Sequence, residues 1–382
     1  MIGDIVECRV CLFDTSIPGV ELDPTGLCNL CRTVQAFEVD YPSGAEGQKI
    51  LSRKVEQIRK DGIGREYDCA MGVSGGGDSS YLLHLFAKVY GLRVLAVHFD
   101  NTWNTSIATR NIHKMCTKLN VDLHTHVVNG EEFDDLTLSF VKAGLRDIEV
   151  PTDIGFAATI NKAASMHGIK WRIDGHNFRT EGIAPLDWVY IDGRYMIDVY
   201  RKWSNCSYSL SSIPNLTMIN QLYLWIFKRI KILRPLYYLD ITKEGTRKLL
   251  MKEYDWEYYG GHHLDNLHSS FFHLYYFAKK WNTNTRIVEY SALLRQGALE
   301  KEEARELSER TDPKAIGKLV SYYKNRHGLS DKDFDDLMAI PRDTHQSYKT
   351  YKKTFERLRP LFYVMLKNEL ISQSFYEKYC CR

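Results

Sequence analysis

The chain has 382 residues, enough for two or three folded units, and its 44% hydrophobic and 26% charged residues are typical of a globular protein. A formal net charge of +3 is nearly balanced, so it gives no electrostatic case for nucleic-acid binding. The longest apolar runs, such as 222–227, are far shorter than the roughly 20 residues that cross a bilayer, so no transmembrane segment is expected.

The N-terminal segment 1–36 is turn-rich and contains two Cys-x2-Cys pairs, Cys8 with Cys11 and, after sixteen residues, Cys28 with Cys31. Two such turns place four thiolates around a zinc ion and leave no open position for water, so we predict a structural zinc site. Reduced free cysteines or a redox pair are the alternatives. The first residues, MIGDIVECRVC, include an acidic residue and no long apolar run, unlike a signal peptide. Because the chain has nine cysteines and no such signal, we expect the reducing cytoplasm.

Helices and strands alternate over residues 37–203, which we predict to form a second domain. The patterns predict a helix at 50–60, a strand at 69–73, a helix at 79–90, a strand at 93–99, a helix at 106–119, a strand at 121–128, a helix at 153–167 and a strand at 169–174. Strands separated by helices pair in parallel, so the predicted fold is a doubly wound parallel α/β sheet. Ligands of such sheets bind beyond the carboxyl ends of the strands.

Residues 204–382 are more aromatic and basic, with mainly helical patterns, and we predict a region that binds a substrate or a partner. Within it, 222–233 mixes apolar residues with lysine and arginine. This stretch is either a helix on a membrane surface or, more commonly, one that packs on its own domain or on a partner subunit.

The stretch SGGGDS at 74–79 lies between the first predicted strand and its helix and has several interpretations. A Walker A loop is excluded because no Gly-Lys-Ser/Thr follows. A dinucleotide fingerprint fits Gly75 and Gly77, with Asp100 as the ribose acid, but Ser80 stands where the third glycine belongs. Asp78 would also repel a pyrophosphate that brings no cation, as in NAD, whereas a triphosphate brings Mg²⁺. A structural turn capped by Asp78 is the remaining alternative.

The stretch matches, position for position, the pyrophosphate loop (PP-loop) of adenylating ATP pyrophosphatases, through Ser74, Gly75, Gly76, Gly77, Asp78 and Ser79. Glycines let backbone N–H groups surround phosphate oxygens, and the helix N-terminus adds a favourable dipole. The serine hydroxyls can donate hydrogen bonds, and Asp78 can hold Mg²⁺. A loop that grips the β,γ-pyrophosphate favours attack at the α-phosphorus, which adenylates the substrate.

Two more segments follow predicted strands and should reach the same edge. In HFDNTWN, Asp100 and Asn101 are placed to meet the ribose or base, while Trp103 either stacks on the ligand or serves as a lid or packing residue. In DGHNFRTEG, polar side chains are available to phosphates, Mg²⁺ or an acyl oxygen: Asp174, His176, Asn177, Arg179, Thr180 and Glu181. The alternative is a polar turn in which Asp174 and Asn177 are local caps.

The four cysteines, SGGGDS, GHNFRTEG and the downstream DWEYYGGHH…FF…SALLRQGALEKEEA together resemble the N-acetyl sugar amidotransferase family, from Cys8 to about Ala304. The resemblance implies an adenine nucleotide alpha-hydrolase-like fold and a role in bacterial surface-polysaccharide or flagellin-sugar biosynthesis. It implies that an acetamido group of a nucleotide-linked sugar becomes an acetamidino group. It further implies ammonia from a separate glutaminase and a channelling subunit, both relatives of the histidine-biosynthesis pair.

In this chemistry ATP adenylates the amide oxygen to an O-adenyl imidate, and ammonia then displaces AMP. Only positioning and charge stabilisation are required of the protein. The predicted catalytic residues are Asp78, Asp174, His176, Asn177 and His263. The predicted cofactors are ATP, Mg²⁺ at Asp78, and structural Zn²⁺; the loop residues, Asp100, Asn101, Thr180 and Glu181 are expected to bind ATP.

The chain departs from the family pattern where Gly-Gly-Lys-His is usual, because His262 takes the place of the lysine and Leu267-His268-Ser269 follows Asp265. Asn284-Thr285-Arg286 likewise replaces Asp-Lys-Arg. Either the substrate differs or activity is weakened. The competing functions are a tRNA-modifying enzyme, which would need a basic face, and an assembly subunit that binds ATP without chemistry.

Overall fold

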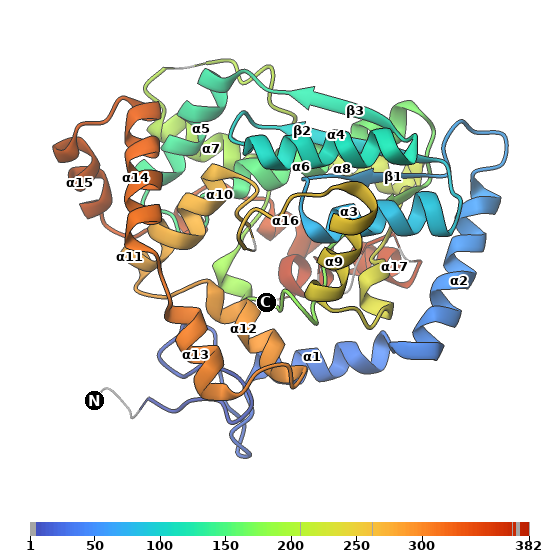
Figure 1. The fold of residues 1–382 in the computed structure, drawn as a ribbon. Helices are drawn as coiled ribbons and strands as arrows, with labels where there is room; N and C mark the ends of the chain where they lie inside the picture. Colours follow the sequence, from blue (N-terminus) through green and yellow to red (C-terminus); the bar gives the residue numbers. More distant parts are fainter. Residues whose placement is uncertain (1–4, 207, 262, 369, 372–374, 382) are drawn as a thin grey trace.

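Five short strands form one parallel sheet in the order β3-β2-β1-β4-β5. The computed structural model describes residues 5–206, 208–261, 263–368, 370–371 and 375–381. The strands are β1 (Cys69–Gly72), β2 (Val94–Asp100), β3 (Asp122–Val127), β4 (Trp171–Ile173) and β5 (Lys231–Leu233). A parallel sheet in this order, with helices on both faces, is a doubly wound α/β fold and confirms the predicted fold class (Figure 1).

Alternate residues of the strands face opposite layers of helices, as the pleat requires. Met71 of β1 packs into a core with α2 (Gly44–Asp61), α3 (Gly77–Leu83), α4 (Ser106–Leu119) and α9 (Lys243–Tyr254). Ala70 packs into a separate core with Val97 of β2 and Ile160 of α6 (Val150–Met166). Both faces of the sheet are therefore covered at these strands, which explains why β1 and most of β2 are apolar.

All four predicted strands are present, but the sequence patterns did not predict β5. Its backbone extends the sheet, since the N–H of Lys231 donates to the carbonyl oxygen of Lys170 at 2.8 Å. A strand of three residues that begins with a lysine and precedes an arginine is too short to give a periodic signal. The helix that was considered over 222–233 is thus wrong for its last residues, while Trp225 packs on the protein itself, 6.2 Å from the Phe362 ring.

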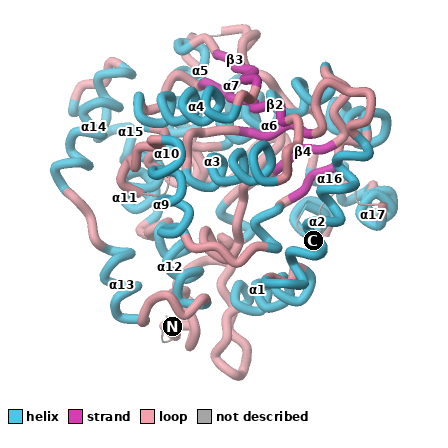
Figure 2. Tube along the Cα trace, turned by 45° about the vertical axis from the view of Figure 1, so that its right-hand side comes forward, coloured by secondary structure: helices cyan, strands magenta, loops and turns pink. Residues whose placement is uncertain are grey.

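Most of the remaining chain is helical, which confirms the prediction for the C-terminal region. Helix α5 was not predicted, although Asn129 caps it by accepting from the N–H groups of Glu131 and Glu132. Figure 2 shows α10, α11, α13, α14 and α15 gathered on one side of the sheet. The other helices are α1 (Asn29–Asp40), α5 (Gly130–Lys142), α7 (Gly193–Trp203), α8 (Met218–Tyr223), α10 (Leu267–Phe271), α11 (Phe277–Trp281), α12 (Arg286–Arg295), α13 (Lys301–Glu309), α14 (Pro313–His327), α15 (Asp331–Ala339), α16 (Lys352–Arg357) and α17 (Arg359–Lys367). Within the described part of the chain, none of the helices has the length and apolar character to cross a membrane.

Candidate active site and metal centre

The glycine loop, residues 74–79, connects the end of β1 to the start of α3. Two serines hold its shape. The Ser74 hydroxyl accepts from the N–H of Gly76 at 3.2 Å, and the Ser79 hydroxyl donates to the carbonyl oxygen of Gly76 at 3.2 Å. Gly76 is the N-cap of α3 and provides no side-chain cap, so the helix N-terminus is suited to an anion, although the Gly77 N–H is a partner of the Tyr259 hydroxyl.

Both the backbone conformation and the close packing at position 75 require a glycine. Its φ of +81° is in the left-handed region, and a Cβ at this position would overlap the carbonyl oxygen of Ala108 in α4. The Gly75 carbonyl oxygen accepts from the Trp256 indole at 3.1 Å and from the Asn111 amide at 3.3 Å. The loop is therefore held in place by α4 and by the segment after α9.

Polar side chains from that same segment lie beside Gly76. A Cβ at Gly76 would lie 3.2 Å from the Tyr259 hydroxyl and 3.6 Å from an oxygen of Asp265, whereas a Cβ at Gly77 would meet open space. Burial raises the pKa of Asp265, and its hydrogen bond with Ser74 opposes the shift. Tyr259 and Asp265 are thus neighbours of the loop, and the sequence analysis assigned no role to Tyr259.

The 174–182 loop follows β4 and lies against the glycine loop, because a Cβ at Gly175 would be 4.0 Å from the N–H nitrogen of Ser79. Asp174 accepts from the N–H of His176 at 3.0 Å, and Asn177 accepts from the N–H of Arg179 at 3.1 Å. Both therefore act as local caps, as the alternative interpretation described. Their predicted catalytic roles stay predictions.

Two arginines control the charge of Asp174. Its carboxylate lies 3.5 Å from Arg234 and 3.9 Å from Arg172. Burial alone would raise the pKa of Asp174, but the charges of Arg234 and Arg172 outweigh burial and lower the pKa to about 2. Asp174 is therefore ionised at neutral pH and pairs with cations of the protein itself.

We expect Arg234→Met to remove an acid-sensitive part of the stability. Because the folded-state pKa of Asp174 lies below its ordinary value, the carboxylate stabilises the fold above about pH 4, and this contribution of about 2 kcal/mol is lost as the pH falls towards 2. Urea unfolding at pH 7 and pH 3 should show a smaller pH dependence in Arg234→Met. The exposed Arg201, changed to Met, is the control; equal pH dependence in Arg234→Met and wild type would contradict the assignment.

A pair of carboxyl groups joins the two loops. Asp78, in the first turn of α3, carries one carboxyl group, and Glu181 carries the other on the 174–182 loop, which lies against the glycine loop at Gly175. Burial and the negative charge of Asp78 raise the pKa of Glu181 well above its ordinary value. The neighbouring Thr180 is buried, and its hydroxyl has no hydrogen-bond partner among the described residues. The pair concentrates negative charge beside the open N-terminus of α3.

The segment after β2 is engaged in protein contacts. Asp100 accepts from the N–H of Thr102 at 2.8 Å, and buried Asn101 accepts from the Asn266 amide at 2.8 Å. Trp103 is only 1% exposed and donates to Asp134 at 2.8 Å, so it is a packing residue and does not stack on a ligand. Asp100 and Asn101 as ATP-binding residues remain predictions.

The histidines after α9 have different environments. His263 is exposed, and its ring stacks on His273 with centroids 4.4 Å apart. His268 is fully buried and lies 3.1 Å from the carbonyl oxygen of Ile148, which makes it a core histidine. His262, the residue in the place of the family lysine, lies outside the described residues.

Lys243, at the N-terminus of α9, is a candidate site residue that the sequence analysis missed. Its ammonium lies 2.5 Å from a carboxylate oxygen of Glu289 in α12. Burial lowers the pKa of Lys243, but the charges of Glu289, Asp78 and Glu181 raise it above its ordinary value. No local motif marks this lysine, because its acidic neighbours come from three distant segments.

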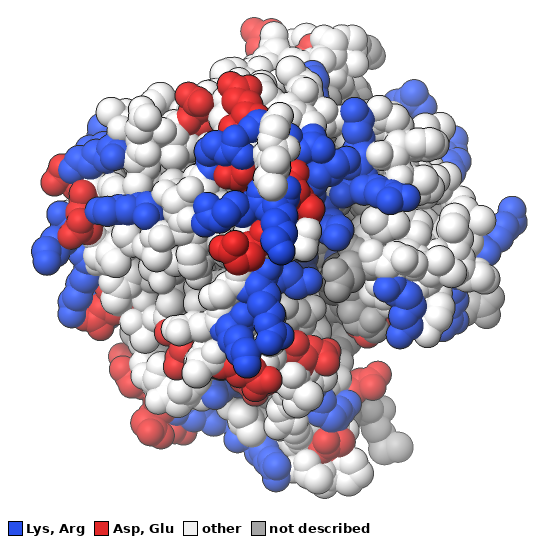
Figure 3. Space-filling view, turned by 90° about the vertical axis from the view of Figure 1, so that its right-hand side faces the viewer, with Lys and Arg blue, Asp and Glu red and all other residues white. Residues whose placement is uncertain are grey.

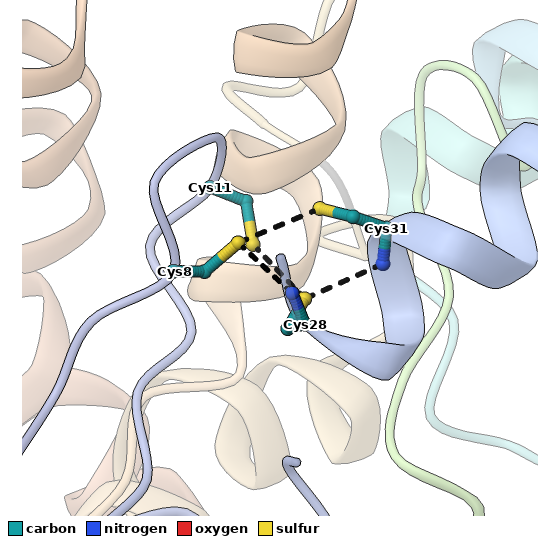
Figure 4. Close-up of side chains that lie close together, drawn as sticks. All are labelled: Cys8, Cys11, Cys28 and Cys31. Atoms are coloured by element: carbon teal, nitrogen blue, oxygen red, sulfur yellow. Dashed lines mark hydrogen bonds between the residues drawn. The ribbon is translucent and has the colours of Figure 1, made fainter. Parts of the chain in front are cut away.

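The four cysteines of the N-terminal segment point their sulfurs toward one another (Figure 4). All four Sγ atoms lie within 4.8 Å of one another, and two pairs, Cys8 with Cys31 and Cys11 with Cys28, are 3.9 and 3.6 Å apart. In the described part of the chain, this is the one group of three or more side chains that could hold a metal ion. It confirms the predicted four-cysteine metal site.

Side chains from α12 and α13 contact this metal centre. The Arg295 guanidinium donates from Nε to the Cys31 sulfur at 3.2 Å, and the Lys301 ammonium donates to the carbonyl oxygen of Cys8 at 2.6 Å. Arg305 also pairs with Glu7, with both oxygens at 2.8 Å. The positive charges of α12 and α13 thus face a cluster of thiols whose ionised form is negative.

Residues 265–359 match the model of the family described as LPS biosynthesis protein WbpG-like, C-terminal domain. This segment is therefore similar to the C-terminal domain of WbpG-like proteins. The WbpG-like domain begins at Asp265 beside the glycine loop and contains α12, so it contributes to both the candidate active site and the metal centre. The match supports the resemblance to the N-acetyl sugar amidotransferase family. None of the curated proteins matches the chain.

The solved structures that are similar to the chain include the following three. NH3-dependent NAD synthetase from Campylobacter jejuni subsp. jejuni NCTC 11168, in complex with the nitrate ion, is 14% identical over 78% of this chain and 98% of that chain, with a TM-score of 0.31. NMN synthetase from Francisella tularensis is 14% identical over 73% and 94%, with a TM-score of 0.32. The U34-tRNA thiolase NcsA from Methanococcus maripaludis with its [4Fe-4S] cluster is 17% identical over 85% and 99%, with a TM-score of 0.30.

Proposed function

We propose that this protein is an ATP-dependent amidotransferase of bacterial surface-polysaccharide biosynthesis that acts in the cytoplasm. It converts an acetamido group of a nucleotide-linked sugar to an acetamidino group. The observation that carries the proposal is the approach of the 174–182 loop, which carries Glu181, to the glycine loop, which carries Asp78. Two neighbouring carboxyl groups repel each other when both are ionised, and a divalent cation relieves this repulsion. A nucleoside triphosphate brings Mg²⁺ to such a site.

The reaction has two steps. The acetamido oxygen attacks the α-phosphorus of ATP, an oxygen–phosphorus bond forms, and the bond to the β-phosphate breaks with release of pyrophosphate. Ammonia then adds to the imidate carbon, AMP departs with the former acetamido oxygen, and loss of a proton leaves the amidine. No nucleophilic side chain is needed; the chain must hold the phosphates and stabilise their charge.

The described residues can share this work. The N–H groups at the start of α3 and the hydroxyls of Ser74 and Ser79 would bind the pyrophosphate that leaves. Asp78 and Glu181 would hold Mg²⁺, which supplies charge neutralisation on the phosphate oxygens. His176, which lies 3.9 Å from Glu181, and the exposed His263 would face the sugar and the imidate. We propose that a separate glutaminase and a channelling subunit deliver the ammonia.

We propose Zn²⁺ as the metal of the four-cysteine centre. Zn–S bonds of about 2.3 Å in a tetrahedron place the sulfurs about 3.8 Å apart. The 3.6 and 3.9 Å separations fit a single ion of this kind. With four protein ligands, its role is structural.

The charge distribution argues against the tRNA-modifying alternative. Figure 3 shows Lys and Arg side chains in a band with Asp and Glu side chains among them. On α4, Arg110 and Lys114 each lie 2.8 Å from Glu257, and Lys118 lies 2.6 Å from Asp255. These cations are already neutralised by the protein, so they are poorly suited to release counterions from an RNA backbone.

The test is incubation of the metal-loaded protein with Mg²⁺, ATP, ammonium and nucleotide-linked diacetamido sugars. We expect AMP and pyrophosphate to form only when the sugar is present, together with a product whose mass reflects replacement of an oxygen by NH. Omitting ammonium should stop the amidine from forming. Release stimulated by tRNA alone would favour the tRNA-modifying alternative, and ATP binding without any release would favour the assembly subunit.

A further inference from the structure

Helix α12 contacts both the candidate active site and the four-cysteine centre. Near its start, Glu289 accepts from Lys243 at 2.5 Å. At its end, Arg295 donates to the Cys31 sulfur, and in between the Ser291 hydroxyl accepts from the N–H of Leu12 at 3.2 Å. One helix of ten residues therefore spans the distance between the two sites.

The same helix also supports the 174–182 loop. A Cβ at Gly182, whose φ is +83°, would overlap the backbone carbonyl oxygen of Val288. Glu181, the carboxyl group paired with Asp78, is the residue next to this contact. A shift of α12 would therefore move both the loop that carries Glu181 and the carboxylate that holds Lys243.

Lys243 is suited to contact phosphate. Its side chain is 33% exposed and its ammonium pairs with Glu289, while the charges of Asp78 and Glu181 also act on it. The reaction outlined above leaves this cation unused, although a leaving pyrophosphate carries several negative charges. A fixed ammonium stabilises such charge more effectively than a mobile one, because it needs no reorganisation during the reaction.

The far end of α12 is anchored by charge. Arg295 is held at Cys31, and its two terminal nitrogens are buried without a hydrogen-bond partner among the described residues. Unpartnered donors of a buried guanidinium are costly unless negative charge lies close by. The four thiolates of a metal-loaded centre would supply that charge, so the centre would hold α12 through Arg295.

We propose that Lys243 is a phosphate-contacting residue of the active site and that α12, anchored at the four-cysteine centre, positions it through Glu289. The proposal rests on the proposed use of ATP but not on the identity of the sugar. It assigns the metal centre a role in keeping the active site in order, in addition to stabilising the N-terminal segment.

The experiment measures the affinity of the metal-loaded full-length protein for Mg²⁺-pyrophosphate by titration calorimetry. We expect Lys243→Met to weaken binding roughly 10- to 100-fold, the effect of losing one charge-assisted hydrogen bond, and Lys243→Arg to restore part of it. Glu289→Gln acts through Lys243 and should weaken binding less than Lys243→Met. Lys248→Met is the matched control, because Lys248 lies on the same helix and forms an exposed pair with Glu244.

Arg295→Met tests the anchor. We expect it to retain the metal, measured by elemental analysis, yet to exchange amide hydrogens faster over 286–295 and to bind pyrophosphate more weakly. Wild-type affinity in Lys243→Met overturns the phosphate contact. Wild-type affinity in both Glu289→Gln and Arg295→Met overturns the positioning through α12. Since no sugar is present, these results stand apart from the outcome of the sugar assay.

Discussion

Replacing Gly75 with alanine is expected to destabilise the protein by about 3 kcal/mol and to abolish ATP binding. The new Cβ would both force a left-handed backbone on alanine and overlap the carbonyl oxygen of Ala108. Relief of that overlap must move the glycine loop away from α4 and from the Trp256 indole. Chemical unfolding and equilibrium binding of Mg²⁺-ATP measure the two effects.

Gly77→Ala is the matched variant in the same loop. A Cβ there meets open space, so the free energy of unfolding should stay within about 0.5 kcal/mol of wild type. ATP binding should still weaken, because a methyl group would hinder close approach of phosphate to the backbone N–H groups. If Gly75→Ala unfolded like wild type, the steric requirement for glycine at this position would be refuted. If both variants bound ATP normally, the phosphate-binding role of this loop would be refuted.

Cys11→Ser is expected to release the metal and unfold the N-terminal segment. Cys11 is fully buried in the cluster, and structural zinc sites contribute about 10–16 kcal/mol of apparent binding free energy in small zinc-binding peptides. Loss of one of four ligands should therefore lower the melting temperature and expose the segment before α1 to proteases. Metal content, calorimetric melting and limited proteolysis are the measurements.

The control for this variant is Cys206→Ser, because Cys206 is exposed and outside the cluster. It should keep one metal ion per chain and melt like wild type. A chelator should reproduce the effect of Cys11→Ser in the wild-type protein. Full metal content and unchanged melting in Cys11→Ser would show that the four thiols do not form a structural metal site.

The predictable parts of the fold are those with a strong local signal. Helix α4 has the predicted bounds because Thr105 caps its start and Asn120 ends it in the left-handed region. The mostly buried strands β1, β2 and β4 follow from short, largely apolar runs between turns. Strand β5 was missed because its three residues become a strand only by pairing with β4.

The same distinction applies to the candidate site. The glycine loop and the two cysteine pairs are contiguous motifs whose residue types carry their chemistry, so the sequence suffices to recognise them. Trp103 shows the converse: the sequence left a stacking residue and a packing residue as alternatives, and only its burial against Asp134 and the C-terminal helices decided for packing.

From the sequence by itself came the doubly wound sheet, the glycine loop after its first strand and the four-cysteine centre, because each depends on neighbours within a few residues. Only the tertiary structure brings Glu181 and Lys243 under the influence of the charge of Asp78. It alone also places the Arg295 guanidinium at the Cys31 sulfur. All three cases join residues more than one hundred positions apart: Asp78 with Glu181, Asp78 with Lys243, and Cys31 with Arg295. The packing of α9 and α12 brings these charged side chains together. A local sequence pattern does not encode that packing.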